Sequence, residues 1–587
     1  MMRKEIIHIL FWLPIGVMSN NWSATFTGDI QSQEDNAVEV EPLLGEIAFS
    51  QYAPYSDKCP MMDGKRTATG CLATAMAQIL AYYKYPLQMN GEKIEYVTEK
   101  YNIPVSWNCS ATTFDWNNIL NTYSENEVEV YTGNETVADE QQLIITGMRL
   151  YEELPSYIEL SRLTSISLAE LSGIVQPLLF DDKGMFIRPV GEGAELEKLR
   201  PKAGYTTNYF KHFVPNNLSD GTYRLYIGFK AVGSNEWSII NKATDENDIY
   251  TSPHSDCYMT LTKTGNYYSI DNRKFLCGYT PVQGDAIATL CAAAGAATHM
   301  EYGTEGSYAN NNNMALGLVN YMGYDDKMFI ISSVKFADKD WLGRIIQAEL
   351  QEQRPVYCCG SVETGGSHAF VIDGCKSIEG VTHFHINWGW NGQDNGYYPI
   401  DRMEMSTGKN FSHSYSLTMG IKPMDNSDQG FVFAAQNFSA SVRDDSIVIS
   451  VNQLINYTIK PFSGDLKVYI IDDNDVEYVL KSYPWENWKE FAGVGTWNIN
   501  IAIPSSIDSG KYKIAIRAKE KGSSKENEVL FPQYPVVMVE KETSNISSIK
   551  SSDINDSPQL YDLSGRRQNA PIKNTISILD GKKVFVK

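Results

Sequence analysis

The sequence predicts an α+β protein in which an α+β domain is interrupted by a β-sandwich-like domain and followed by a β-sandwich domain. Apolar residues recur at helical spacing after Gly70, and two short β-like runs follow from His368 onward. Two longer stretches, residues 125–282 and 426–541, alternate apolar and polar residues between Gly, Asn and Asp turns. Helical and strand signals segregated in this way are typical of α+β architecture.

Length and composition limit the class of protein. A chain of 587 residues is too long for one hydrophobic core, so several domains are expected. With 43% hydrophobic and 21% charged residues, the composition excludes a disordered, collagenous or mostly membrane-embedded chain. The formal net charge of −21 repels phosphate backbones, so we expect no nucleic-acid partner. No run of eighteen or more apolar residues occurs, so we expect no membrane span.

The N-terminus has the order of a secretory signal peptide. Arg3 and Lys4 precede an apolar stretch over residues 6–18, and Ser19 offers a small residue for cleavage. The apolar stretch is too short to cross a bilayer. We therefore expect residues 1–19 to be a signal peptide and the protein to be secreted or held at the cell surface; a buried N-terminal helix is the alternative.

A cysteine stands at the predicted start of a helix. Within residues 67–86 the apolar positions follow a helical period, Gly70 interrupts the preceding chain and Pro86 ends the pattern. Cys71 therefore lies in the first helical turn, where free backbone N–H groups stabilise a thiolate. Taken alone, the pattern also fits an ordinary buried core cysteine.

A histidine and an asparagine lie on two predicted strands. Residues 365–373 and 381–390 form β-like runs joined by a short polar turn, and a hairpin would set His368 beside Asn387. An imidazole between a cysteine sulfur and an asparagine side chain is the arrangement for attack on an acyl carbon.

Several motifs together resemble one enzyme family. The stretches GCLATAMAQIL, GGSHAFVIDG and NWGWNGQDNGYY are similar to those of streptopain-type cysteine proteases, family C10 of the papain-like fold. The resemblance covers residues 41–124 and 283–425, which implies that these two segments form one papain-like catalytic domain.

The resemblance implies roles for four residues. Cys71 would be the nucleophile, His368 the general base and acid, Asn387 the residue that orients the imidazole, and Gln51 a side-chain donor to the oxyanion hole. It implies a protein or peptide substrate, a thiolate and imidazolium pair formed by Cys71 and His368, a thioester acyl-enzyme and no cofactor or metal.

The spacing of the catalytic pair indicates an insertion. In papain-like enzymes the histidine follows the cysteine by ~130–150 residues, whereas Cys71 and His368 are 297 positions apart. The excess matches residues 125–282, which we interpret as an inserted β domain with a short helical lead-in over residues 139–153. Residues 426–541 read as a second sandwich without catalytic motifs.

The C-terminal end has the composition of an appendage. Residues 542–558 are rich in Ser and Asn, which is typical of a linker. Residues 559–587 resemble the C-terminal secretion or attachment modules of exported Bacteroidetes proteins; a hairpin docked on the preceding domain is the alternative.

Three further features have simple structural interpretations beside their functional ones. His383 and His385 share a strand face, but no third ligand at a recognisable spacing favours a metal site. Cys358 and Cys359 read as strand residues, one of them a candidate for a disulfide with Cys375. Residues 310–313 form either a connector or a loop beside the substrate cleft.

These observations lead to the expectation of a secreted cysteine endopeptidase. The family usually carries an N-terminal pro-domain, yet only about twenty residues separate Ser19 from Glu41. We therefore expect the inserted domain or an external inhibitor protein to restrain activity. The alternatives are a secreted adhesin or glycan-binding protein on a degenerate papain-like scaffold, and an amide-transfer enzyme with the same thioester chemistry.

Overall fold

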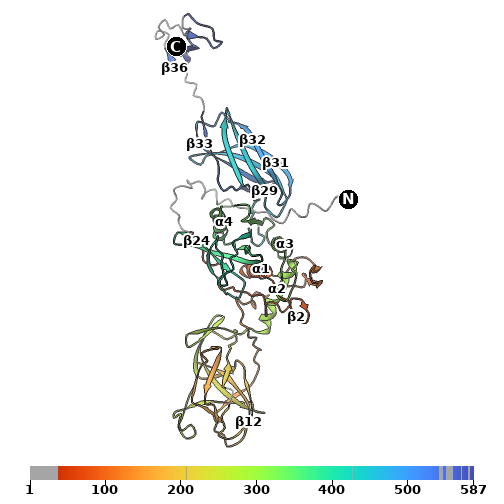
Figure 1. The fold of residues 1–587 in the computed structure, drawn as a ribbon, viewed down its shortest axis with the longest axis vertical. Coiled ribbons are helices and arrows are strands. Elements are labelled where there is room, and N and C mark those ends of the chain that lie inside the picture. The colour runs from red at the N-terminus through yellow and green to blue at the C-terminus, as the bar shows by residue number, and fades with distance from the viewer. Residues whose placement is uncertain are drawn as a thin grey trace.

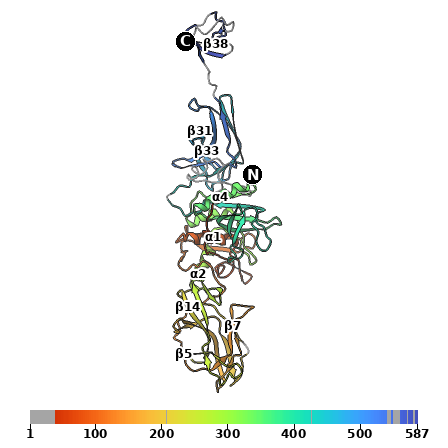
Figure 2. The ribbon, with the colours of Figure 1, turned by 90° about the vertical axis from the view of Figure 1, so that its left-hand side faces the viewer.

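The computed structural model describes most of the chain in three large parts. Figures 1 and 2 show a central α+β region between an inserted β region at one end and a C-terminal sandwich at the other. This arrangement confirms the predicted α+β class with accessory β regions. The predicted signal peptide lies outside the described residues; of the predicted linker only residues 547–549 are described, and they form a strand, β36, rather than irregular chain. The described residues are 38–205, 208–336, 338–425, 427–540, 547–549, 560–569, 572–579 and 582–586.

In the central region, α1 and α4 pack against an antiparallel sheet of order β21-β26-β22-β23-β24-β25, and α2 and α3 pack against α1. Helix α1 contacts both β23 and α2 within one hydrophobic core. The helices are α1 Cys71–Tyr83, α2 Pro281–Ala297, α3 Asn312–Met322 and α4 Lys339–Gln351. The strands are β1 Met61–Met62, β2 Lys65–Arg66, β3 Lys93–Val97, β4 Pro104–Asn108, β21 Phe329–Ser332, β22 Val356–Ser361, β23 Ser367–Ile378, β24 Val381–Asn387, β25 Gly396–Pro399 and β26 Ser414–Met419.

The helix and hairpin that carry the predicted site residues form where the sequence places them. Helix α1 starts at Cys71 directly after Gly70, and its side chains from Leu72 to Ala81 are buried. Strands β23 and β24 are joined at Glu379 and Gly380, both of which have positive φ angles as a tight hairpin turn requires.

The inserted region has a hydrophobic core of its own, separate from that of the central region. Its largest sheet has nine strands and contains the path β11-β10-β14-β18-β19-β20. The strands are β5 Thr136–Ala138, β6 Leu143–Ile145, β7 Gly147–Leu150, β8 Tyr157–Ser161, β9 Thr164–Ser165, β10 Leu171–Asp181, β11 Phe186–Pro189, β12 Ala194–Leu199, β13 Tyr209–Lys211, β14 Gly221–Ala231, β15 Glu236–Ile239, β16 Asn241–Ala243, β17 His254–Ser255, β18 Met259–Thr264, β19 Tyr267–Ile270 and β20 Arg273–Leu276.

The expected helical lead-in over residues 139–153 is wrong. This segment forms β6 and β7 instead. Leu143, Ile144 and Ile145 are all buried, because β6 pairs with β16 on one side and β9 on the other. A strand inside a sheet buries consecutive side chains on both faces, whereas a surface helix buries one stripe.

The C-terminal region is a sandwich of two sheets with its core between them. Its strands are β27 Phe433–Ala434, β28 Asn437–Arg443, β29 Ser446–Asn456, β30 Phe462–Asp472, β31 Glu477–Trp488, β32 Gly493–Ala502, β33 Gly510–Glu520, β34 Glu526–Glu528 and β35 Val536–Val539. The terminal module, drawn beyond this sandwich in Figure 1, contains β36 Ser547–Ile549, β37 Leu560–Tyr561, β38 Thr575–Leu579 and β39 Lys582–Val586.

The inserted region and the C-terminal sandwich repeat one structural plan around a glycine. Strand β10 pairs with β14 so that Gly173 faces Ala231, and β30 pairs with β33 so that Gly464 faces Glu520. A Cβ atom on either glycine would lie 2.1 Å from a backbone carbonyl oxygen of the partner strand. Both positions therefore require glycine for the same close backbone approach.

The repeat extends to the far ends of these strand pairs. β10 and β30 end at Asp181 and Asp472, and each carboxylate accepts two backbone N–H groups of the following turn. Opposite them lie Tyr223 and Tyr512, and each hydroxyl donates to the carbonyl four residues earlier. The same turn and the same tyrosine contact thus close both modules.

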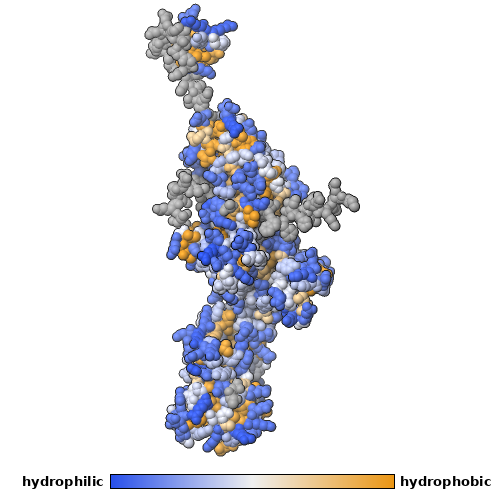
Figure 3. Space-filling model, viewed as in Figure 1, coloured by the Kyte–Doolittle hydropathy of each residue, from blue (hydrophilic) through white to orange (hydrophobic). Residues whose placement is uncertain are grey.

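The visible face is mainly hydrophilic, with scattered apolar residues (Figure 3). Isolated exposed apolar side chains are normal for a folded protein. Among the described residues, no helix is long and apolar enough to span a membrane.

Candidate active site

Cys71 is the first residue of α1, and three backbone N–H groups surround its thiol. Those of Cys71 itself, Leu72 and Ala369 favour the thiolate. The residue is partly exposed, yet desolvation of the thiol dominates and raises its pKa. Burial thus favours the protonated thiol, while three backbone donors are placed to receive negative charge on sulfur.

Gly70 gives the chain its sharp entry into α1. Its φ angle is +91°, and a Cβ atom there would lie 2.8 Å from the Met300 sulfur and 3.1 Å from the Ser307 Cβ. Only glycine fits both the backbone angle and this space. Substitution would displace Cys71 from its N–H donors.

His368 lies next to Cys71 because Ala369, whose N–H faces the sulfur, is the following residue of β23. The ring is 5% exposed, and burial lowers its pKa to about 4. Its Nε2 lies 2.7 Å from the carbonyl oxygen of Trp388. A carbonyl only accepts, so Nε2 carries the hydrogen and Nδ1 has the free lone pair. His368 is therefore one residue along β23 from the N–H that faces the Cys71 sulfur, although the two residues are 297 positions apart in sequence.

Aromatic rings enclose the imidazole. Trp390 has its ring centroid 4.7 Å from that of His368, and Phe411 lies at 5.6 Å. Phe411 approaches because Gly360 leaves room: a Cβ there would meet the Phe411 carbonyl oxygen at 2.4 Å. Trp388 adds a nearly parallel ring at 6.2 Å. This cover excludes water and accounts for the neutral imidazole.

The structure corrects the expected contact of Asn387. Its side-chain amide donates to the carbonyl of Ile47 at 2.5 Å, and its Oδ1 accepts the N–H of Gly389 at 3.2 Å. The register of the hairpin is the reason: Asn387 pairs with Val371, three residues beyond His368. Asn387 therefore ties the segment near Ile47 to the end of β24, and the Trp388 carbonyl holds the imidazole.

Gln51 belongs to a segment that runs along the start of α1. Its carbonyl accepts the N–H of Thr69, two residues before Cys71, at 2.9 Å. Farther back, the N–H of Phe49 donates to the side chain of Gln78 on α1 at 3.0 Å. These bonds hold the backbone of residues 49–51 against α1 and the residues that lead into it.

The loop after β24 contains the contacts that sequence reasoning missed. The Trp388 indole donates to the Asp394 carbonyl at 2.9 Å, and the Asn391 N–H donates to the Phe49 carbonyl at 2.8 Å. The stretch NWGWNGQDNG predicts such a tight loop through its density of Gly and Asn. Four of its residues have positive φ angles: Gly389, Asn391, Gly392 and Asp394.

The expected disulfide is wrong: all nine cysteines are free, and all nine lie within the described residues. Cys358 and Cys359 pair with Phe370 and Ala369 on β23, whereas Cys375 lies farther along that strand. The Cys375 thiol contacts the Val38 carbonyl instead.

The two strand histidines have protein partners. His385 Nδ1 lies 2.6 Å from the buried carboxylate of Asp373. His383 Nδ1 lies 3.0 Å from the carbonyl oxygen of Val381, two residues earlier on the same strand. Within the described residues, no group of three or more potential ligands could hold a metal ion.

The segment at residues 310–313 lies beside the site. Asn311 accepts a hydrogen bond from the buried Tyr357 hydroxyl at 2.8 Å, and its side chain interacts with the Cys359 thiol. The Cys359 and Cys71 thiols are within electrostatic range of each other. The start of α3 is thus connected to the neighbourhood of the nucleophile.

The sequence pattern of the peptidase C10 family matches residues 49–146 and 200–398, about half of the chain. The chain belongs to the peptidase C10 family. The match includes Cys71, His368 and Gln51, and its gap falls inside the inserted β region.

Individual relatives agree with this assignment. Streptopain of Streptococcus pyogenes is 35% identical over 148 residues, which is 24% of this chain and 36% of streptopain. The thiol protease/hemagglutinin PrtT of Porphyromonas gingivalis is 26% identical over 298 residues, 48% of this chain and 33% of PrtT. The chain thus spans about a third of each relative. Prevotella intermedia interpain A, a solved cysteine protease, aligns with 66% of this chain and 98% of its own at 20% identity and a TM-score of 0.35.

Proposed function

We propose that the protein is a secreted cysteine endopeptidase that cleaves peptide bonds through a thioester acyl-enzyme. The observation that carries this proposal is the Ala369 N–H directed at the Cys71 sulfur, because His368 is the residue that precedes Ala369 on β23. Nucleophile, base and N–H donors then occupy one site, as acyl transfer requires.

The hydrogen bond that the His368 ring makes determines which ring nitrogen can accept the thiol proton. Because burial favours the neutral thiol and the neutral imidazole, His368 acts as a general base during attack. Its free Nδ1 takes the thiol proton as the Cys71 sulfur bonds to the peptide carbonyl carbon. The imidazolium then returns that proton to the leaving amine, and water hydrolyses the thioester.

The developing oxyanion needs donors, which Cys71 and Gln51 would supply. The N–H of Cys71 lies at the positive end of α1, and Gln51 would add a side-chain amide. In this proposal Asn387 acts indirectly, since it fixes the segment that leads to Gln51.

The division of the chain is part of the proposal. Residues 41–124 and 283–425 form the peptidase domain, and residues 125–282 and 426–541 are accessory β domains. The signal-like residues 1–19 support export. Residues 559–587 would serve secretion or attachment.

The test is cleavage of an unfolded protein under reducing conditions. Cys71→Ala should abolish cleavage, because it removes the thiol that starts α1 and receives the Ala369 N–H. Cys257→Ala, a partly buried thiol of the inserted region, is the matched control and should retain wild-type rates. Product masses separate hydrolysis from amide transfer. Cleavage by the Cys71→Ala protein at the wild-type rate would refute the proposal.

A further inference from the structure

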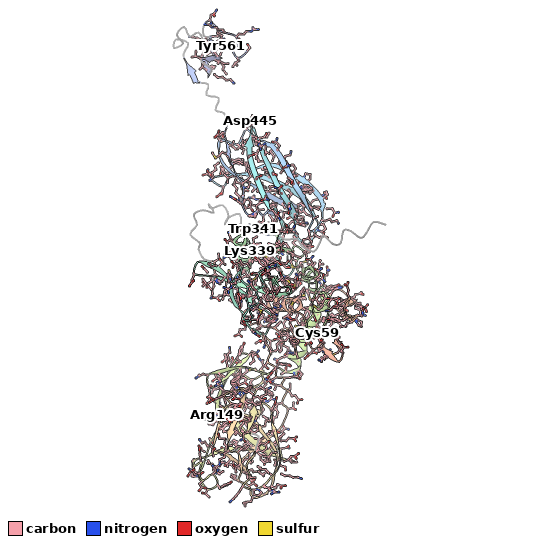
Figure 4. The ribbon with its side chains drawn as sticks, in the orientation of Figure 1. Cys59, Arg149, Lys339, Trp341, Asp445 and Tyr561 are labelled. Carbon is pink, nitrogen blue, oxygen red and sulfur yellow. The ribbon has the colours of Figure 1, made fainter. Side chains whose placement is uncertain are left out.

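A cavity of about 480 Å³ lies where the central region meets the C-terminal sandwich. Its walls come from the end of α1, the end of α4, residues 422–432 and strand β34. Figure 1 shows α4 next to the sandwich, and Figure 4 places Lys339 and Trp341, from the start of α4, on that side. Cavities of this size at domain junctions are common ligand sites.

Most charges around the cavity are neutralised by protein partners. Arg354 binds the buried Glu349 through two hydrogen bonds of 2.8 Å. Lys327 bridges Asp428 and Glu520, the latter at 2.6 Å. The Lys327–Glu520 pair links the central region to the sandwich, and the Arg354–Glu349 pair lies within the central region.

Lys525 is the exception. It lines the cavity, and no acidic oxygen lies within 4.0 Å of its amine in the described part of the chain. Burial and the nearby cations Arg354 and Lys422 lower its pKa, although Asp428 and Glu352 act in the opposite direction. An ammonium among other cations would gain from an added anion.

One carboxylate completes the polar side of the cavity. The Glu352 carboxylate reaches Arg354 only at 3.5 Å, and its side chain is 35% exposed. A partly exposed carboxylate with one long ion pair can accept hydrogen bonds from a charged ligand donor.

The remaining wall is apolar and aromatic. Tyr82, Tyr83, Phe329 and Val432 line it. A fitting ligand therefore has a carboxylate for Lys525, a positively charged N–H donor for Glu352, and a small apolar group. A short peptide with a free C-terminus and a free N-terminus combines all three.

We propose that this cavity binds a short peptide through its C-terminal carboxylate, with Lys525 as the anion-binding residue. Such peptides are products of the proposed peptidase reaction, so their origin rests on the proposed function, whereas their binding does not. The cavity adjoins the C-terminal end of α1, and Cys71 begins that helix about 20 Å away. The two sites are therefore separate.

The test is calorimetric titration of the full-length Cys71→Ala protein with L-alanyl-L-phenylalanine. We expect saturable binding, at least tenfold weaker for the C-terminal amide of the same dipeptide, since the amide lacks the anion. Lys525→Gln should weaken binding by a similar factor. Lys521→Gln is the matched control, because Lys521 is exposed, pairs with Glu486 and does not line the cavity.

Each outcome decides the proposal. No binding to the Cys71→Ala protein, or equal binding of acid and amide, overturns it. Equal binding by Lys525→Gln also overturns it and assigns the heat to another site. The amide comparison uses an unaltered cavity, so a folding defect in the Lys525 variant would not obscure the answer. None of these measurements depends on catalysis, so they fail or succeed apart from the proposed function.

Discussion

The inserted region and the C-terminal sandwich are built on the same plan but attached to the central region in different ways. The insertion is held by a narrow neck, where Val128 and Tyr279 share a backbone hydrogen bond of 2.8 Å. The C-terminal sandwich meets a broader surface through side-chain pairs such as Lys460 with Asp326 at 2.6 Å. This comparison distinguishes the residues that form each β module from the residues that attach it to the central region.

The neck also lies closer to the catalytic machinery. Thr122, at the base of the insertion, donates to the Asn391 side chain at 3.2 Å. Asn391 belongs to the loop whose Trp388 carbonyl holds His368. The C-terminal sandwich contacts instead the side of α1 and α4 that carries the cavity. The two β regions therefore share one strand arrangement but contact different parts of the central region.

The largest expected effect tests the shared plan itself. Gly173→Val and Gly464→Val should each destabilise their own module by about 3 kcal/mol, because a side chain collides with the partner backbone. Limited proteolysis with mass spectrometry will show which module opens. Gly495→Val, where a Cβ meets nothing within 4 Å, is the control. If only one glycine variant is destabilised, the two modules are not equivalent.

The second-largest expected difference between the two β modules is their stability at low pH. His212 of the inserted region is buried between Tyr268 and the Pro155 carbonyl, and burial lowers its pKa from 6.5 to about 4. Between these values the unfolded chain binds a proton that the folded chain does not. Stability of the insertion therefore falls as pH drops from 6.5 to 4, by up to about 3 kcal/mol.

The C-terminal sandwich contains no histidine within residues 426–541, so it lacks this contribution. Urea unfolding at pH 7 and pH 4.5, read by proteolysis of each module, checks the difference. His212→Gln should remove most of the pH dependence of the insertion. Equal acid sensitivity of both modules would point to carboxylates instead.

The smallest expected effect concerns attachment. Thr122→Val removes the bond to Asn391 and should lower kcat/KM about tenfold through the loop that holds His368. Lys460→Gln removes a sandwich contact and should leave kcat/KM unchanged. Steady-state kinetics on a peptide substrate compares them, and equal losses would mean that the neck has no special link to the site.

The sequence alone predicts the parts of the site that depend on side chains and periodicity. The helical period after Gly70 and the hairpin turn at Glu379 and Gly380 place Cys71 and His368 on the correct elements. Sequence patterns could not identify the Trp388 carbonyl as the acceptor for His368, because every residue type has a backbone carbonyl. The hairpin register is equally hidden, since an irregularity between Ile372 and Gly374 shifts the pairing.

Other errors have physical causes as well. The disulfide prediction failed because proximity in sequence says nothing of where Cys375 lies along its strand. The helical lead-in failed because apolar runs such as residues 143–145 read alike in buried strands and helices. The module repeat leaves short signals in the sequence, SG near the start of each long strand and DD at its end. Their meaning is clear only once the structure shows Gly173 and Gly464 at equivalent positions in their strand pairs.

The imidazole of His368 rests on the main chain rather than on a side chain. No amino-acid replacement at position 388 deletes that acceptor, so a saturation library there would report on aromatic shielding alone. Misaligning the ring requires bending the turn that presents the carbonyl, which makes its glycines, and not its tryptophan, the sensitive positions for any redesign of catalytic geometry.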